Sequence, residues 1–173
     1  DISSLDAQLS EAGDIAIVNI SDLTLSNVIA TDGGIDVKVF GNVTITKANT
    51  LGASDKNDIT VQTFKKGGTA NLTLTEVKAS GRGDVTLKAQ GSMTQSTNVI
   101  TADVLEIEAE GSLSLRTDVS AAKIQTKGVG AVTLTQTTSK KLELQDLDVF
   151  DGSLTVSASG IVEATDVLLN TDQ

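Results

Sequence analysis

The sequence contains no cysteine and no histidine. Without cysteine, the chain can form neither disulfide bonds nor thiolate nucleophiles and metal ligands. Without histidine, it lacks the commonest general base and transition-metal ligand, and it can form no Ser–His or Cys–His nucleophilic pair. These two absences exclude most familiar hydrolase and metalloenzyme sites.

Proline is absent as well, and aromatic residues make up only 2% of the chain. No strand is therefore interrupted by a residue that lacks a backbone N–H. Because bulky rings are scarce, a core in this chain has to be filled by Val, Leu, Ile and Ala. Turns are left to Gly, Asp, Asn, Ser and Thr.

Positive charge is also in short supply, since 23 acidic residues face 13 basic ones and the net charge is −10. Such a chain repels phosphate backbones and anionic membranes, so we expect no nucleic-acid partner. No apolar run approaches the roughly 20 residues of a spanning helix, so we expect no membrane insertion. The opening residues "DISSLDAQLSEAGD" have neither the basic nor the apolar region of a signal peptide, which places any export signal outside this segment.

A short phrase recurs along the chain, in which a turn residue precedes alternating apolar and polar residues, as in "GDIAIV", "GDVTLKA" and "GSLTVSA". The first inward residues of these phrases are Ile15, Ile35, Ile59, Val85, Leu105, Val132 and Leu154. Their spacing drifts between 20 and 27 residues, which is typical of a solenoid with loops of variable length. The pattern predicts about seven coils.

Each unit carries further short strands. A second phrase starts about eight residues after the first, as Met93 follows Val85 and Leu113 follows Leu105. A third apolar pair closes most units, at Val28/Ile29, Val77/Ala79, Val99/Ile100, Val119/Ala121, Leu147/Val149 and Val167/Leu169. Three strands per turn, with β-branched residues inside and turn residues at the corners, predict an all-β fold, a parallel β-helix over residues 1–173.

Two other fold classes need comparison with this one. An α/β fold is excluded because no helical stretch of 10 to 12 residues separates the strands. A β-sandwich stays open, since it also uses regular short strands. Repetition of one phrase favours stacked equivalent coils, which bury together a core that a single coil cannot bury.

Residues 83–115, "GDVTLKAQGSMTQSTNVITADVLEIEAEGSLSL", resemble the degenerate repeats of filamentous-haemagglutinin-like proteins, which are large bacterial secreted and surface-bound adhesins. The similarity extends to "GAVTLTQT" and "DGSLTVSASG". It implies a right-handed parallel β-helix that serves as a stalk or adhesive shaft. The secretion-domain motifs of that family are not visible, so the segment resembles an interior slice of a longer array.

The leading hypothesis for function is a non-enzymatic structural or adhesive segment of a large exported bacterial surface protein, without a cofactor. Its partners would be host-cell or glycan surfaces, reached from a secreted or cell-surface location. The alternative is a carbohydrate-binding or polysaccharide-degrading β-helix. Catalysis would need paired carboxylates, or an Arg or Lys base, beside a groove built by long loops. The longest expected loops, 47–57, 63–70 and 136–141, carry lysines and few acids.

Three local motifs are candidate sites. Arg82-Gly83-Asp84 is the tripeptide that many extracellular ligands offer to integrins, but Gly-Asp also precedes an inward residue at Gly13-Asp14, so only Arg82 exceeds what the turn requires. Asp55, Asn57 and Asp58 are the best candidates for Ca²⁺, although they lack the Gly and terminal Glu of an EF-hand loop. Three N-x-[ST] sequons, at Asn19, Asn42 and Asn71, are interpreted as part of the repeat phrase.

Outward threonines raise an ice-binding alternative, because flat threonine arrays on solenoids can order water. The outward positions that match the seven inward ones are Ala16, Asp36, Thr60, Thr86, Glu106, Thr133 and Thr155. The charges of Asp36 and Glu106 interrupt any flat face, which argues against ice.

The two ends of the segment raise a last question. A β-helix without caps exposes strand edges and an open core, so the favoured expectation is weak end-to-end self-association, opposed by the net charge at low salt. The alternative is a cap in which Ile2, Leu5 and Leu9 form one amphipathic helical turn.

Overall fold

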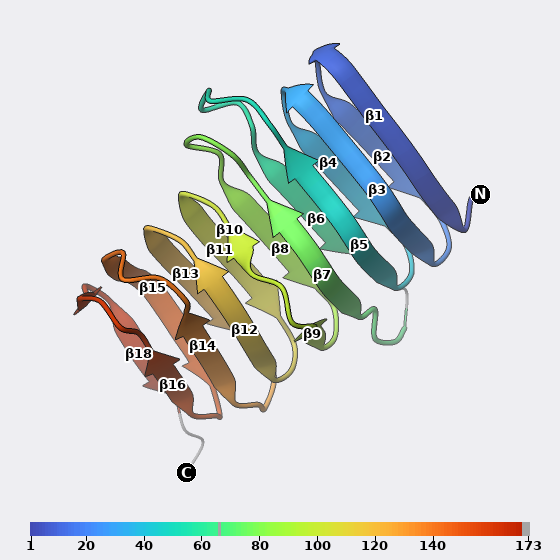
Figure 1. The fold of residues 1–173 in the computed structure, drawn as a ribbon. Helices are drawn as coiled ribbons and strands as arrows, with labels where there is room; N and C mark the ends of the chain where they lie inside the picture. The colour runs from blue at the N-terminus through green and yellow to red at the C-terminus, as the bar shows by residue number, and fades with distance from the viewer. Residues whose placement is uncertain (66, 171–173) are drawn as a thin grey trace.

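The computed structural model describes residues 1–65 and 67–170, and within this part every regular element is a β-strand. The strands form two nine-stranded sheets, and each strand pairs in parallel with its counterpart about one turn away along the chain. The result is a solenoid of about eight turns, a parallel β-helix as the sequence predicts. The first strand, β1, and the last, β18, lie at opposite ends of the stack (Figure 1).

Sheet A contains β1 (Ser4–Ala12), β3 (Leu23–Asp32), β5 (Val43–Thr50), β7 (Leu72–Lys78), β9 (Met93–Gln95), β10 (Ile100–Thr101), β12 (Leu113–Asp118), β14 (Val132–Gln136) and β16 (Leu154–Ser157). Sheet B contains β2 (Ile15–Asn19), β4 (Ile35–Val39), β6 (Ile59–Thr63), β8 (Val85–Ala89), β11 (Val104–Ala109), β13 (Ala121–Thr126), β15 (Leu142–Phe150), β17 (Val162–Ala164) and β18 (Val167–Asn170).

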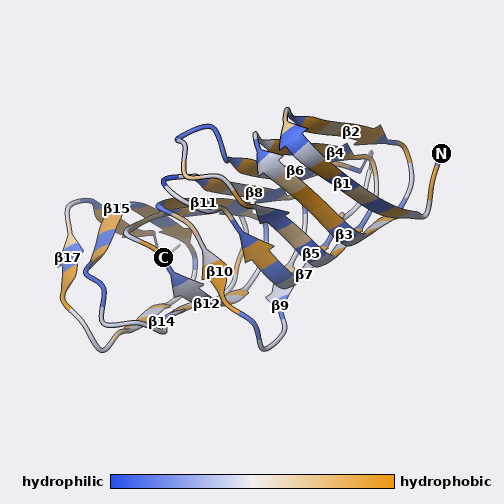
Figure 2. Ribbon diagram, turned by 45° about the horizontal axis from the view of Figure 1, so that its top comes forward, coloured by the Kyte–Doolittle hydropathy of each residue, from blue (hydrophilic) through white to orange (hydrophobic). Residues whose placement is uncertain are grey.

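The alternation of apolar and polar residues decides which side chains enter the core. In β4, Ile35, Val37 and Val39 are buried, while Asp36 and Lys38 point outward. This is the period of two that an extended strand imposes. Figure 2 shows the same alternation of hydrophobic and hydrophilic residues along both sheets.

The core is aliphatic, as expected from the composition. Every buried hydrophobic side chain is Val, Leu, Ile or Ala, with Met93 as the one exception in the described part of the chain. The three phenylalanines all reach the surface; Phe40 and Phe150 are exposed and Phe64 is partly buried. The interior between the two sheets is thus filled mainly by close-packed aliphatic side chains, with a few buried Thr, Asn and Gln side chains among them.

The expected phase of the repeat is correct for the first five coils and wrong for the last two. Ile15, Ile35, Ile59, Val85 and Leu105 follow one another in register on sheet B. Val132 and Leu154, however, lie on sheet A, where Val132 pairs with Leu113. The true sheet B successors of Leu105 are Ala122, Leu144 and Ala164, which raises the number of turns from seven to about eight.

The physical reason for this error is that the same phrase begins the strands of both sheets. Each strand leaves a tight corner, and a Gly, Asp, Asn or Ser residue followed by an aliphatic residue suits either corner. The authentic sheet B position is occupied by Ala122, a weak hydrophobic residue only 17 positions after Leu105. A spacing shorter than the other repeats therefore hid one complete turn.

The structure arranges each turn in two sheets, whereas the sequence predicts three strands per turn. In β3 the second and third apolar segments form one continuous strand, with Leu23 and Leu25 buried before the bend and Val28 and Ala30 after it. The alternation changes phase at Ser26, where the register with β1 also shifts. The segments separate into two strands only where β9 and β10 occupy one turn and β17 and β18 another.

Both ends of the solenoid leave the core partly open. At the N-terminal end, Ser4–Ala12 is the strand β1, so the expected alternative of a helical cap is wrong. Ile15 and Ile17 are only partly buried there. At the other end, Leu154 and Val156 are partly buried, and the hydrophobic residues of β18 are exposed. Residues 171–173, which end the expected last strand, lie outside the described residues.

The inward and outward faces predict opposite effects for the same substitution. Leu113 is buried in sheet A. Thr133 lies on the adjacent strand, one position past the residue that pairs with Leu113, and it points outward. We expect Leu113→Asp to abolish folding, because an unpaired buried carboxylate costs several kcal/mol, comparable with the whole stability of a domain. Thr133→Asp should change the melting temperature little. Equal destabilisation of the two variants, measured by thermal melts, would contradict the assigned faces.

Candidate functional site

The Arg82-Gly83-Asp84 motif lies at the corner that leads into β8. Arg82 is exposed, while Gly83 is buried. A Cβ atom on Gly83 would lie 2.3 Å from the backbone oxygen of Asn57, so only glycine fits there. The close approach of two neighbouring turns explains this glycine, since Gly83 is not among the glycines with a positive φ. Positive φ occurs two residues earlier, at Gly81 (φ +71°).

Asp84 belongs to a row of aspartates that join successive turns at this corner. The Asp84 backbone N–H donates to Asp58 Oδ1 at 2.8 Å, and Asp84 Oδ1 accepts from the Val104 N–H at 3.0 Å. Asp14 Oδ1 accepts in the same way from the Gly34 N–H. Each carboxylate therefore holds a backbone N–H of the following turn, which is a structural use of the Gly-Asp pair.

The same corner gathers negative charge. Burial raises the pKa of Asp84, the Val104 N–H bond lowers it, and the nearby charges of Asp58, Asp103 and Asp55 raise it again, with a net increase. Asp84 therefore holds its proton at a higher pH than an ordinary aspartate.

The candidate Ca²⁺ residues are not brought together as ligands. Asn57 is fully buried, and its Oδ1 accepts from the Gly33 N–H at 3.0 Å while its Nδ2 donates to the Ser54 oxygen at 2.9 Å. Asp58 Oδ1 is the acceptor for the next turn, as described above, and Asp55 is exposed. Over residues 1–65 and 67–170 there is no cluster of three or more His, Cys, Asp or Glu residues that could hold a metal ion. Asn57 is instead the polar hub of its loop.

The sequon asparagines also link turns, at the corner that leads into sheet A. Asp22 Oδ1 accepts from the Asn42 N–H, Asn42 Oδ1 from the Asn71 N–H, and Asn71 Oδ1 from the Ser92 N–H. Asn19 is buried and donates through Nδ2 to the oxygens of Ile2 and Ser21. These contacts explain the asparagines as part of the repeat.

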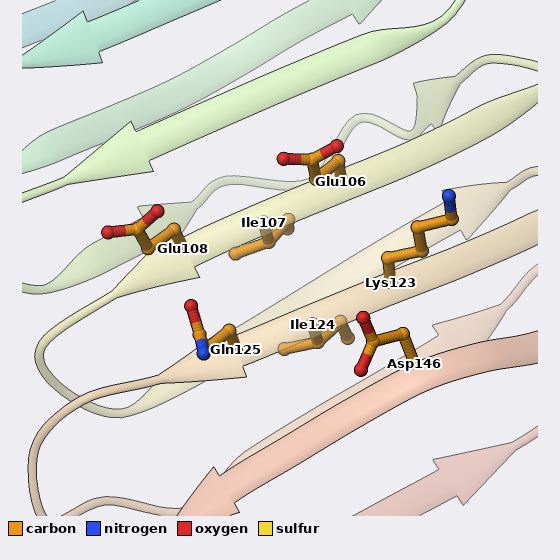
Figure 3. A pocket seen from close by; sticks show the side chains of 7 residues that line it. All are labelled: Glu106, Ile107, Glu108, Lys123, Ile124, Gln125 and Asp146. Carbon is orange, nitrogen blue, oxygen red and sulfur yellow. The ribbon is translucent and has the colours of Figure 1, made fainter. Parts of the chain in front are cut away.

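The outer face of sheet B carries a shallow hollow of about 240 Å³. Figure 3 shows Glu106 and Glu108 of β11 on its upper side, with Lys123 and Gln125 of β13 and Asp146 of β15 below. Lys88 Nζ lies 3.2 Å from Glu106 and 3.6 Å from Glu108, and Lys127 also pairs with Glu108.

The electrostatics of this hollow indicate an ion-pair network. The hydrogen bond from Lys127 lowers the pKa of Glu108, and the charges of Lys127 and Lys88 lower it further. The hydrogen bond to Glu106 raises the pKa of Lys88. Glycoside hydrolysis uses one carboxylic acid that stays protonated. Glu108 is shifted in the opposite direction and serves as an ionised partner for lysine.

The outward positions form two separate rows, which the sequence alignment had mixed. On sheet B, the row runs through Ala16, Asp36, Thr60, Thr86, Glu106 and Lys123. On sheet A, it runs through Ser4, Thr24, Thr44, Thr73, Thr94, Ser114, Thr133 and Thr155. The expectation that charges interrupt the threonines is therefore wrong for sheet A. The repeated "LTL", "VTI" and "VTL" of its strands was the signal in the sequence that could have shown this row.

The fold and surface define a parallel β-helix whose polar side chains join its turns. No helix able to cross a membrane occurs among the described residues. The chain matches no protein-family model, and neither a curated protein nor a solved structure is significantly similar to it.

The aspartate row yields a prediction with a matched pair of variants. Asp84→Asn keeps an oxygen for the Val104 N–H and removes the charge, so it should be at least as stable as the wild type at pH 7. Asp84→Ala leaves that N–H without its acceptor and should lose about 1 kcal/mol.

The pH dependence of unfolding provides the second measurement. Because the folded-state pKa of Asp84 is raised above its ordinary value of 3.8, the folded protein binds a proton before the unfolded chain does as pH falls. The wild type should gain stability relative to Asp84→Asn as pH falls from above the raised pKa to 3.8. Denaturant melts that show Asp84→Asn as unstable as Asp84→Ala at pH 7 would refute this account.

Proposed function

We propose that this chain is a non-enzymatic structural segment of a large exported bacterial surface protein, in which the β-helix acts as a shaft that carries adhesive surfaces. The observation that supports the proposal is the continuous parallel pairing of strands in both sheets through about eight turns. At about 4.8 Å per turn this makes a rod on the order of 35 Å long.

A shaft needs each turn to be held by its neighbours, and the contacts described above supply this. Backbone ladders join successive strands, the aspartates at one corner and the asparagines at the other bind the next turn, and the core runs through both sheets. An array of such turns distributes its stability over nearest-neighbour interfaces and extends without a change of architecture. The resemblance to adhesin repeats supports the exported, surface-bound location.

A carbohydrate-binding function is the second candidate, supported by an aromatic pair that follows the C-terminal ends of β4 and β6 in sheet B. The rings of Phe40 and Phe64 lie 5.5 Å apart, and Phe40 is 54% exposed. Phe64 also lines a hollow of about 130 Å³ together with Gln62 and Gln90. Exposed apolar side chains beside a few polar groups are typical of ligand sites.

One set of assays separates these functions. We expect no release of reducing sugar from a panel of bacterial and host polysaccharides, whereas turnover that is lost in Glu108→Gln would contradict the shaft proposal. On a glycan array, binding that is lost in Phe40→Ala and kept in Val129→Ala, another exposed hydrophobic residue, would establish the carbohydrate-binding candidate. Antibodies against the segment should label intact cells of the source organism without permeabilisation, and labelling only after permeabilisation would contradict the surface location.

The open ends support a further proposal about partners, namely weak end-to-end association of the isolated segment. β16 and β18 present partly buried and exposed aliphatic side chains, and β1 presents an unpaired strand edge. The net charge of −10 opposes association, so added salt should promote it. Sedimentation velocity at rising protein and salt concentrations measures this, and a strictly monomeric segment under all conditions would contradict it.

A further inference from the structure

The outer face of sheet A carries a row of hydroxyl side chains that continues through all eight turns. Six of its members are threonine, and the other two are Ser4 and Ser114. The members at the centre of the face, such as Thr44, Thr73 and Thr94, are exposed. No charged residue interrupts this row.

A second row lies beside the first, two residues further along the strands. Its members within the strands of sheet A are Asp6, Ser26, Thr46, Thr75, Arg116, Thr135 and Ser157. Asp6, on the first strand, and Arg116 are its charged members. The two rows together form a grid of hydroxyl and methyl groups, which we call the threonine array.

Sheet B provides an internal control for the origin of this array. Threonine is favoured in strands, so the stability of the sheet is by itself enough to explain a row of threonines. The outward row of sheet B has the same parallel register and also points away from the core, although most of its members are half-buried. It nevertheless contains Asp36, Glu106 and Lys123 as well as Thr60 and Thr86. The fold therefore tolerates charges at these positions, and their exclusion from the first row of sheet A is a property of that face.

The hydroxyl groups of the array make few hydrogen bonds within the protein. In the described part of the chain, their side-chain hydrogen bonds are those between Ser4 and Ser26 (2.8 Å) and between Thr94 and Thr73 (3.4 Å). Threonines elsewhere are used differently: Thr50 Oγ1 donates to the Asn57 oxygen and Thr63 Oγ1 to the Ala70 oxygen, both in buried positions. Most hydroxyl groups of the array are therefore free to bind a ligand outside the sheet.

The spacing of the array indicates which ligand fits it. Equivalent residues of neighbouring strands are about 4.8 Å apart, and alternate residues of one strand about 6.7 Å apart. In tetrahedrally bonded water with O···O distances of about 2.75 Å, second-neighbour oxygens are about 4.5 Å apart. The repeat of the array along the solenoid axis therefore lies within about 0.3 Å of a repeat of the ice lattice.

From this grid we propose that the threonine array binds an ice surface. Neutral side chains suit an uncharged lattice, the methyl groups supply apolar contact, and the hydroxyl groups can take the places of lattice waters. The occupants of other classes fit less well. Sugar rings call for an aromatic platform, which the array does not contain, and nucleic acid calls for more cations than Arg116 alone. The proposal goes beyond the function of a shaft and does not depend on it.

The test compares two double variants with the same substitutions, one on exposed threonines of sheet A and one on half-buried threonines of sheet B. Thr44→Lys/Thr73→Lys places two lysines on adjacent strands of the array, and Thr60→Lys/Thr86→Lys places two on adjacent strands of sheet B. The charge change and the original residues are the same. Circular dichroism and thermal melts establish that each variant folds. Thr133→Lys/Thr155→Lys, an adjacent pair further along the array, replaces the first variant if that one does not fold.

The measurements are the partition of each protein into slowly grown ice and the thermal hysteresis of its solution. We expect the wild type and the sheet B variant to enter ice, and the array variant to be excluded like serum albumin. Exclusion of the wild type, or equal incorporation of both variants, would overturn the proposal. A parallel assay uses microcrystalline cellulose and chitin. Binding there that is lost only in the array variant, with no incorporation into ice, would overturn ice in favour of a crystalline polysaccharide.

Discussion

The backbone hydrogen bonds that run along the solenoid axis are the constraint on which everything else in this molecule depends. They join residues about one turn apart in sequence, so that Ile15, Ile35 and Ile59 stack as equivalents on one sheet. Each such bond contributes only about 1 kcal/mol net, but every turn contributes a set of them. An inward side chain is buried only when the turns on both sides are present, which makes ladder and core inseparable.

The corners keep this ladder in register. Asn42 and Asn71 at one corner, and Asp58 and Asp84 at the other, each accept a backbone N–H from the next turn. A slip of one residue would break these bonds and also turn the core side chains outward. Some residues of the motifs that suggest glycosylation, integrin recognition or calcium binding, among them Asn42, Asn57 and Asp84, make polar contacts that join one turn to another.

Much of the fold could be predicted from the sequence, because alternation identifies strands and their inward faces, and the scarcity of aromatic residues predicts an aliphatic core. The assignment of strands to sheets could not, since one phrase begins the strands of both sheets and Ala122 is too weakly hydrophobic to mark its turn. The roles of Asn57 and Asp84 depend on partners 20 or more residues away, which only the register reveals. For the same reason the sequence did not reveal the row of threonines, because the wrong phase of the repeat aligned Thr133 with Glu106.

The absence of cysteine in the natural sequence allows a direct test of the register, by introducing two cysteines at a time. Residues opposite each other on adjacent strands lie within reach of a short thiol-specific cross-linker, because neighbouring strands are about 4.8 Å apart. Ser114 is the partner of Thr133 on sheet A, whereas Glu106 lies on sheet B. The account predicts rapid intramolecular cross-linking of Ser114→Cys/Thr133→Cys and none of Glu106→Cys/Thr133→Cys, as detected by peptide mass spectrometry. Cross-linking of the second pair in place of the first would contradict the two-sheet register.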